Sequence, residues 1–139
     1  MANELNLSLL IANFKEARLG LLRLHKALLE NEKDNYEAAN GKIKTTGEYY
    51  NLVVNDPQFA WLRQMSGVIV EIDEALNAKK VLMTEETVLE LAGQIRSLLI
   101  TDADSEFAKK YDAALQTSPD AMFEHLITLK KLAKFSNEV

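Results

Sequence analysis

Three carboxylates lie close together in the stretch VIVEIDEAL, residues 68–76, at Glu71, Asp73 and Glu74. Two carboxylates that converge on one point could hold a metal ion or act as a general acid/base pair. Successive residues of a helix are turned by about 100°, so these three side chains point in three directions. We therefore expect Glu71 and Glu74 to face water. Asp73 borders the apolar face of the helix, and we expect it to accept a hydrogen bond from another helix, with exposure and a ligand role as the alternatives.

The two histidines are the other candidates for chemistry. His25 has leucines three and four residues away on both sides, and His125 lies at the edge of an apolar helical face, so packing competes with ligation for both. Ferritin-like di-iron bundles use Glu-x-x-His on two helices, but Leu22 and Met122 precede the histidines here by three residues. A zinc site from His25, His125 and Asp73 would require tertiary convergence. We predict no catalytic residue, no metal and no cofactor.

A third candidate is the stretch TDADSEF, residues 101–107, whose acids resemble the start of a calcium loop. An EF-hand loop that begins at Asp102 requires glycine and glutamate where the chain has Phe107 and Ala113. We therefore predict a helix-capping turn. The sequence also has no glycine-rich phosphate loop, no Gly-x-Ser-x-Gly and no His-Glu-x-x-His.

Aromatic residues gather on both sides of the NDP turn at residues 55–57. They are Tyr49, Tyr50, Phe59 and Trp61, and Arg63 follows. Packing at a corner between helices explains such a cluster, and an exposed surface for a partner or an apolar ligand is the alternative. Phe59 and Val70 fall outside the main apolar arc of their helix, so each needs a second neighbour, in the same chain or another.

The segment DPQFAWLRQMSGVIVEIDEAL, with LHKALLENEKDNYE upstream, is similar to a segment of small bacterial helical proteins that share a DP-x-FAWLR helix start. The likeness covers roughly residues 21–79 and is most specific at Asp56, Pro57, Phe59, Trp61, Leu62 and Arg63. The resemblance implies a bacterial soluble protein. It brings no activity and no catalytic residue with it.

The elements that must position these residues all read as helices, because breakers are few. In residues 4–39, Leu7, Phe14, Leu21 and Leu28 recur every seven residues, and a second stripe of Leu22, Leu29 and Tyr36 lies about 100° further round. Such a wide apolar arc suits a helix with more than one neighbour. Gly41 supplies the stop.

Cap signals divide the rest of the chain. Thr45 is expected to open a short helix, Asp56-Pro57 a helix to about residue 79, Thr84 another, Asp104 or Ser105 a short fifth, and Ser118-Pro119 the last. A separate pattern concerns the last helix. Its expected inward residues are Met122, Leu126, Leu129 and Ala133.

Composition limits the class of protein. The chain has 139 residues, a net charge of −5 and no cysteine. We expect a single domain over residues 1–139, no secretory signal, no membrane span, a cytoplasmic location and no nucleic-acid partner. The fold prediction is an all-α helical bundle of four main helices with one or two short connecting helices.

For function, the surplus apolar surface favours a non-catalytic protein that acts through protein–protein interaction or self-association as a dimer. The alternative is a bundle that binds a small ligand or a metal with His25, Asp73 and an aromatic corner of Tyr49, Tyr50 and Trp61. The candidate ligand or partner contacts are His25, Tyr49, Tyr50, Phe59, Trp61, Arg63 and Asp73.

Overall fold

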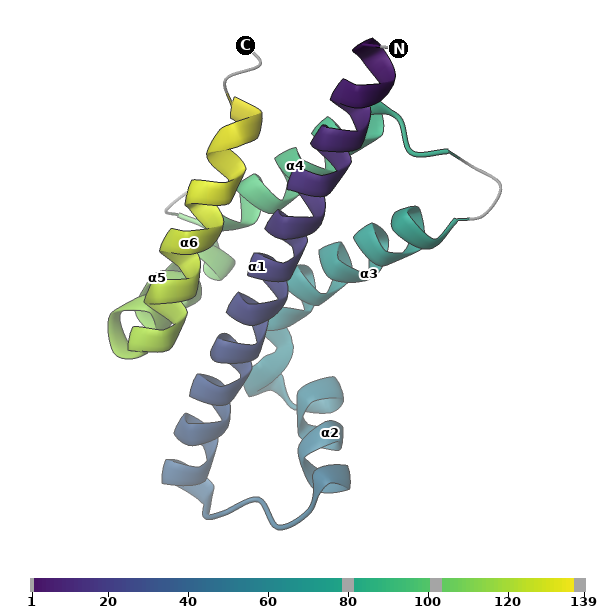
Figure 1. Ribbon diagram of the computed structural model, residues 1–139. Coiled ribbons are helices and arrows are strands. Elements are labelled where there is room, and N and C mark those ends of the chain that lie inside the picture. Colours follow the sequence, from purple (N-terminus) through teal and green to yellow (C-terminus); the bar gives the residue numbers. More distant parts are fainter. Residues whose placement is uncertain (1, 79–81, 101–103, 137–139) are drawn as a thin grey trace.

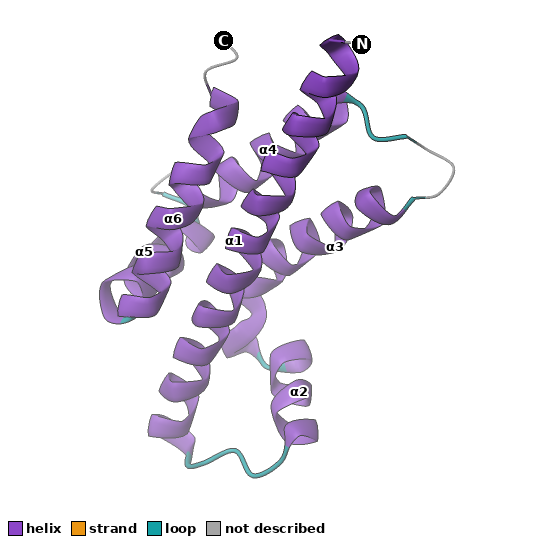
Figure 2. Ribbon diagram, in the orientation of Figure 1, coloured by secondary structure: helices purple, strands orange, loops and turns teal. Residues whose placement is uncertain are grey.

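The computed structural model describes residues 2–78, 82–100 and 104–136. These residues form six α-helices and one 3-10 helix, with no strand among them (Figures 1 and 2). In chain order the elements are α1 (Ala2–Asn40), α2 (Thr46–Asn55), η1 (Pro57–Leu62), α3 (Arg63–Asn77), α4 (Glu85–Leu99), α5 (Glu106–Thr117) and α6 (Pro119–Ser136). The prediction of an all-α protein is confirmed.

Hydroxyl caps begin four of the helices. The side-chain oxygens of Thr45, Thr84, Ser105 and Ser118 each accept a hydrogen bond from the backbone N–H three residues later, at 3.0 to 3.1 Å. This contact satisfies a backbone donor that has no partner within the helix. Gly41 follows α1 with φ of 88°, a left-handed conformation that glycine adopts without strain. The predicted starts are confirmed, with Ser105 rather than Asp104 as the cap of α5.

The helix expected from Asp56-Pro57 begins differently. Asp56 Oδ1 accepts from the N–H of Gln58, and its carbonyl accepts from the N–H of Phe59, so the first six residues form the 3-10 helix η1. Three residues per turn place Phe59 and Leu62 on one side, and both are buried. The α-helix proper starts only at Arg63. Its predicted end near residue 79 lies outside the described residues.

The core forms around α1, the longest helix. Its residues Phe14, Leu21 and Leu28 are fully buried against Met65 and Ile72 of α3 and Val88 and Ile95 of α4. Figure 1 shows α6 running antiparallel beside α1, α3 crossing α1, and α2 lying at one end of the molecule. The second stripe of α1, Leu22, Leu29 and Tyr36, is half-buried. The expectation of a helix with several neighbours is confirmed, since α1 packs against η1, α3, α4 and α6.

The predicted inward face of α6 is confirmed for Met122 and Leu129, which pack against the core, and is wrong for Leu126 and Ala133. Leu126 is 57% exposed and Ala133 is also exposed, whereas Ala121, Thr128 and Leu132 are buried. The cause is a close approach of α6 to α1 at Gly20, where an added Cβ would lie 2.6 Å from Thr128 Oγ1. Thr128 is fully buried at that crossing, and its hydroxyl donates to the Glu124 carbonyl at 2.7 Å. At this crossing the side of α6 that carries Thr128, rather than the side that carries Leu126, faces α1.

Within the described helices, none combines the length and the hydropathy needed to cross a membrane.

Candidate functional site

A row of polar contacts joins α1 to η1 and α3. Arg18, His25 and Glu32 follow one another at seven-residue intervals, so they share one side of α1. Arg18 contacts Asp73, His25 contacts Ser66, and Glu32 contacts Gln58 and Trp61. As the residue numbers rise along α1, the numbers of their partners in α3 and η1 fall, as expected for antiparallel segments. We call this row the polar seam.

Asp73 has a cationic partner in the polar seam. Its Oδ1 accepts a hydrogen bond from Arg18 Nε at 2.7 Å, and both side chains are partly exposed. The expected hydrogen bond from another helix is therefore confirmed. Glu71 and Glu74 are exposed, as expected, and Glu71 accepts a 3.3 Å hydrogen bond from Gln94. The three carboxylates do not form a joint site.

His25 and Ser66 are 2.8 Å apart, which is the spacing of a catalytic base and its nucleophile. The Ser66 hydroxyl also donates a hydrogen bond to the Leu62 carbonyl at 3.2 Å. Burial lowers the pKa of His25, so the ring is neutral at pH 7 and Nε2–H donates to Ser66 Oγ. No carboxylate among the described residues bonds to the other ring nitrogen, so the third member of a triad is lacking. The pair ties α1 to α3.

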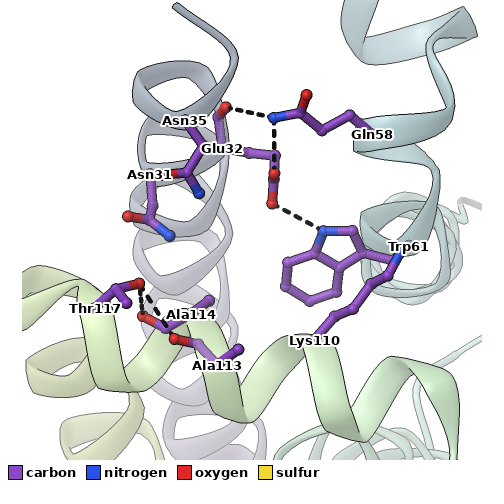
Figure 3. Close-up of a pocket in the computed structure, with 9 residues that line it drawn as sticks. All are labelled: Asn31, Glu32, Asn35, Gln58, Trp61, Lys110, Ala113, Ala114 and Thr117. Carbon is purple, nitrogen blue, oxygen red and sulfur yellow. Dashed lines mark hydrogen bonds between the residues drawn. The ribbon is translucent and has the colours of Figure 1, made fainter. Parts of the chain in front are cut away.

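Trp61 lies at the end of the polar seam beside a hollow of about 320 Å³ (Figure 3). Its indole N–H donates to Glu32 Oε2 at 3.0 Å, and the Gln58 amide donates to Glu32 Oε1 at 3.0 Å. Both carboxylate oxygens are therefore engaged inside the protein, and they fix the indole in place. Asn31 from α1 and Lys110 from α5 line the same hollow. We call it the Trp61 hollow.

The aromatic corner at the NDP turn is mainly a packing site. Phe59 is 1% exposed, and its ring centroid lies 6.3 Å from those of Tyr36 and Tyr49. The second neighbour that Phe59 needs is thus in the same chain. Burial, with a smaller effect of Glu30, raises the pKa of the Tyr49 hydroxyl. Tyr50 is 70% exposed.

Arg63 has a local role. Its Nη2 donates to the Val54 carbonyl at 2.6 Å, in the last turn of α2. The positive charge of an arginine at a helix C-terminus also interacts favourably with the helix dipole. Arg63 therefore holds α2 to the start of α3.

A series of ring contacts that sequence reasoning missed runs from Trp61 to His125, with one stacked pair, Phe107 and Tyr111. Ring centroids are 5.6 Å apart for Trp61 and Phe107, 5.7 Å for Phe107 and Tyr111, and 5.4 Å for Tyr111 and His125. The Tyr111 hydroxyl lies 2.6 Å from His125 Nδ1. Burial lowers the pKa of His125 and raises that of Tyr111, so both groups are neutral and share one hydrogen bond. The four-residue spacing of Phe107 and Tyr111 places them on one face of a helix, and this spacing could have indicated their contact.

A second hollow, of about 510 Å³, lies between α4, α5 and α6 next to this Tyr111–His125 pair. Leu99, Leu115 and Leu129 make much of its lining. Two further hollows, of about 300 and 320 Å³, open beside the start of α1 and beside Pro57. Of the seven predicted contact residues, Trp61 alone lines any of these four hollows.

The predicted ligand set does not come together in these hollows. Asp73 bonds to Arg18 and His25 bonds to Ser66, at different points along α1, and neither lines a hollow named above. The aromatic corner divides as well, because Tyr49 packs on Phe59 whereas Trp61 packs on Phe107. In the described part of the chain, no three histidine, aspartate or glutamate residues lie close enough to hold a metal ion.

The surface of α6 carries exposed apolar side chains. Phe123 is 61% exposed and Leu126 is 57% exposed, and Ile127 beside them is half-buried. Asp120, Lys130 and Lys134 are exposed on the same side. We call these six residues the outer face of α6. Val70 of α3, at 54%, is a separate exposed apolar residue.

Comparison with known proteins indicates no function, so a functional proposal must rest on the hollows and the outer face of α6. No protein-family model, no curated protein and no solved structure matches the chain.

Proposed function

We propose that the chain is a non-catalytic helical-bundle protein that acts through protein–protein interaction by associating with a second copy of itself. In this proposal α1, α3, α4 and α6 are the four main helices, and α2, η1 and α5 are the short connecting ones. The observation that carries the proposal is the outer face of α6, which exposes Phe123 and Leu126 one turn apart. Burying one such side chain against a partner is worth about 1.5–3 kcal/mol.

The structure changes the grounds for this proposal. Phe59 and the second stripe of α1 are covered or half-covered by the same chain, so they supply little free apolar surface. Phe123 and Leu126 lie on the helix that packs most extensively on α1, and the Gly20 crossing orients them outward. A rigid helix presenting an apolar centre between charged ends has the anatomy of a docking surface.

The polar groups of the interior support a non-catalytic role. The histidines, Tyr111 and Ser66 form neutral pairs, and Asp73 is paired with Arg18. Each of these groups contributes a contact between two elements. The ligand-binding bundle that the sequence leaves open has its remaining support in the hollows beside Trp61 and beside His125, rather than in His25 and Asp73.

The proposal extends to the setting of the protein. A net charge of −5 disfavours binding to nucleic acid, and the absence of cysteine suits a reducing cytoplasm. A bacterial origin follows from the resemblance at the DP-x-FAWLR helix start.

Sedimentation velocity across the micromolar concentration range tests self-association. We expect the mean sedimentation coefficient to rise with concentration for the unchanged chain. The double variant F123S/L126S should remain a monomer, because it removes the apolar centre of the outer face. V70S is the matched control on α3 and should behave as the unchanged chain. A chain that stays monomeric at the highest concentration contradicts the proposal, and a dimer lost with V70S would move the surface to α3.

A further inference from the structure

We infer that the second copy docks through its own α6, antiparallel to the first, so that Asp120 of each copy faces Lys134 of the other; this rests on the proposed self-association. The two α6 helices would be related by a two-fold axis that passes between Leu126 and Ile127. Such an interface is isologous, so each contact occurs twice.

The charges on the outer face are separated along α6. Asp120 lies in its first turn and Lys134 in its last, with Lys130 one turn before. At about 100° per residue, all six residues of the outer face fall within an arc of about 120°. Asp120, Lys130 and Lys134 form no ion pair with any other described residue. The face is therefore acidic at one end, apolar in the middle and basic at the other end.

This order of charges selects the antiparallel arrangement. In a parallel pair, Asp120 would meet Asp120 of the other copy, and the lysines would meet lysines. In the antiparallel pair, residue numbers that face each other sum to about 253 or 254, so Asp120 meets Lys134 and Phe123 meets Lys130. The first pair is attractive, and the aliphatic chain of Lys130 can cover the Phe123 ring.

The apolar residues occupy the centre of the same arrangement. Leu126 and Ile127 lie at the axis, where Leu126 of each copy faces Ile127 of the other. Apolar residues at the centre with charges at the rim are the usual order in an interface. The hydrophobic contact supplies the affinity, and the end charges select the direction of docking.

The size of the surface predicts a weak dimer. The 18 residues of α6 span about 27 Å, and a helix about 10 Å wide gives a footprint of roughly 270 Å². A standard stable interface buries about 800 Å² on each partner. We therefore expect association that depends on concentration and that weakens as salt screens the end charges.

The helix dipole offers a competing account of the same charges. An acid in the first turn and a base in the last stabilise α6 without any partner. The two accounts differ for a charge exchange. If the charges serve only the helix dipole, α6 should be less stable in D120K/K134E than in either single variant. If they face each other in an antiparallel dimer, the exchange should restore docking.

The experiment compares D120K, K134E and D120K/K134E by sedimentation velocity at low salt. Each single variant places two like-charged pairs in the dimer, so we expect its dissociation constant to rise about tenfold or more. The double variant exchanges the ends and should return to within about threefold of the unchanged chain. E90K and K15E reverse exposed charges on α4 and α1, and they should leave the dimer unaffected.

Mixing the two single variants sharpens the test. In a heterodimer of D120K and K134E, the introduced lysine would face the introduced glutamate, and the unchanged Lys134 would face the unchanged Asp120, so both end pairs attract. We expect the mixture to associate although neither variant does so alone. A dimer insensitive to D120K and K134E, or a mixture that stays monomeric, overturns the antiparallel arrangement and leaves self-association standing. A monomeric unchanged chain overturns both.

Discussion

At the residue scale, several polar side chains of the interior act in pairs. Burial keeps His25 neutral against Ser66 and His125 neutral against Tyr111, while Asp73 accepts a hydrogen bond from Arg18. A neutral pair across two helices costs less to bury than a charge. These pairs therefore act as links between elements, and the histidines make the stability of the protein depend on pH.

Acidification should destabilise the fold through the histidines. Burial lowers the pKa of both below the ordinary value of about 6.5, so below pH 6.5 the unfolded chain binds protons more readily than the folded chain does. The stability from the neutral rings is fully present above pH 6.5 and is lost as the pH falls toward the folded-state pKa. We expect the urea midpoint to fall between pH 7.5 and pH 5.

Replacement of the more deeply buried histidine identifies the cause. H25Q removes one titrating ring, so its urea midpoint should fall less steeply over that pH range than the midpoint of the unchanged chain. H125Q should show the same effect to a smaller degree. Equal slopes in all three chains would show that carboxylates, rather than histidines, set the acid response.

At the element scale, the local features were predictable and the orientations were not. Thr45, Thr84 and Ser118 begin helices because a hydroxyl bonds to a backbone N–H only three residues away. The side of α6 that faces inward meets Gly20, far earlier in the chain, where an added Cβ would lie 2.6 Å from the Thr128 hydroxyl oxygen. The site follows the same rule. Trp61 was a candidate from the sequence, but its contact with the Phe107 ring depends on how α5 packs.

The crossing of α1 and α6 should respond to Gly20→Ala with a loss of stability. Alanine raises helix propensity by about 1 kcal/mol, but its Cβ would lie 2.6 Å from the fully buried Thr128 hydroxyl. Overpacking of this kind costs about 1–3 kcal/mol, so we expect a lower urea midpoint. T128A added to G20A removes the clashing atoms and should recover part of the loss.

Two other helical glycines supply the matched controls. A Cβ at Gly67 or Gly93 meets nothing within 4 Å, so the same change there should raise the midpoint through helix propensity alone. If G20A stabilises the chain as G67A and G93A do, the helices separate freely at the crossing, and the close approach does not set the orientation of α6.

At the scale of the whole molecule, stability is distributed unevenly. The buried residues of α1, α3, α4, α5 and α6 form one cluster together with Leu62 of η1. By contrast, α2 contains no buried residue, and Figure 1 shows it at the end of the molecule away from α4 and α6. Its links to the rest are the packing of Tyr49 on Phe59, the Lys33 ammonium over the Tyr49 ring, and the Arg63 bond to Val54. We therefore expect α2 to open while the core remains folded.

Native-state hydrogen exchange should resolve these two levels of stability. Amides of α2 should exchange through local opening at a free energy well below that of global unfolding, because few buried contacts oppose it. Amides near Leu21 and Ile95 should exchange only with global unfolding. Y49A should speed exchange in α2 and leave the core amides unchanged, whereas I95A should lower protection throughout, since loss of a core side chain costs about 2–5 kcal/mol. Equal protection of α2 and the core would mean that α2 folds as part of a single cooperative unit, and that its surface contacts are stronger than their exposure indicates.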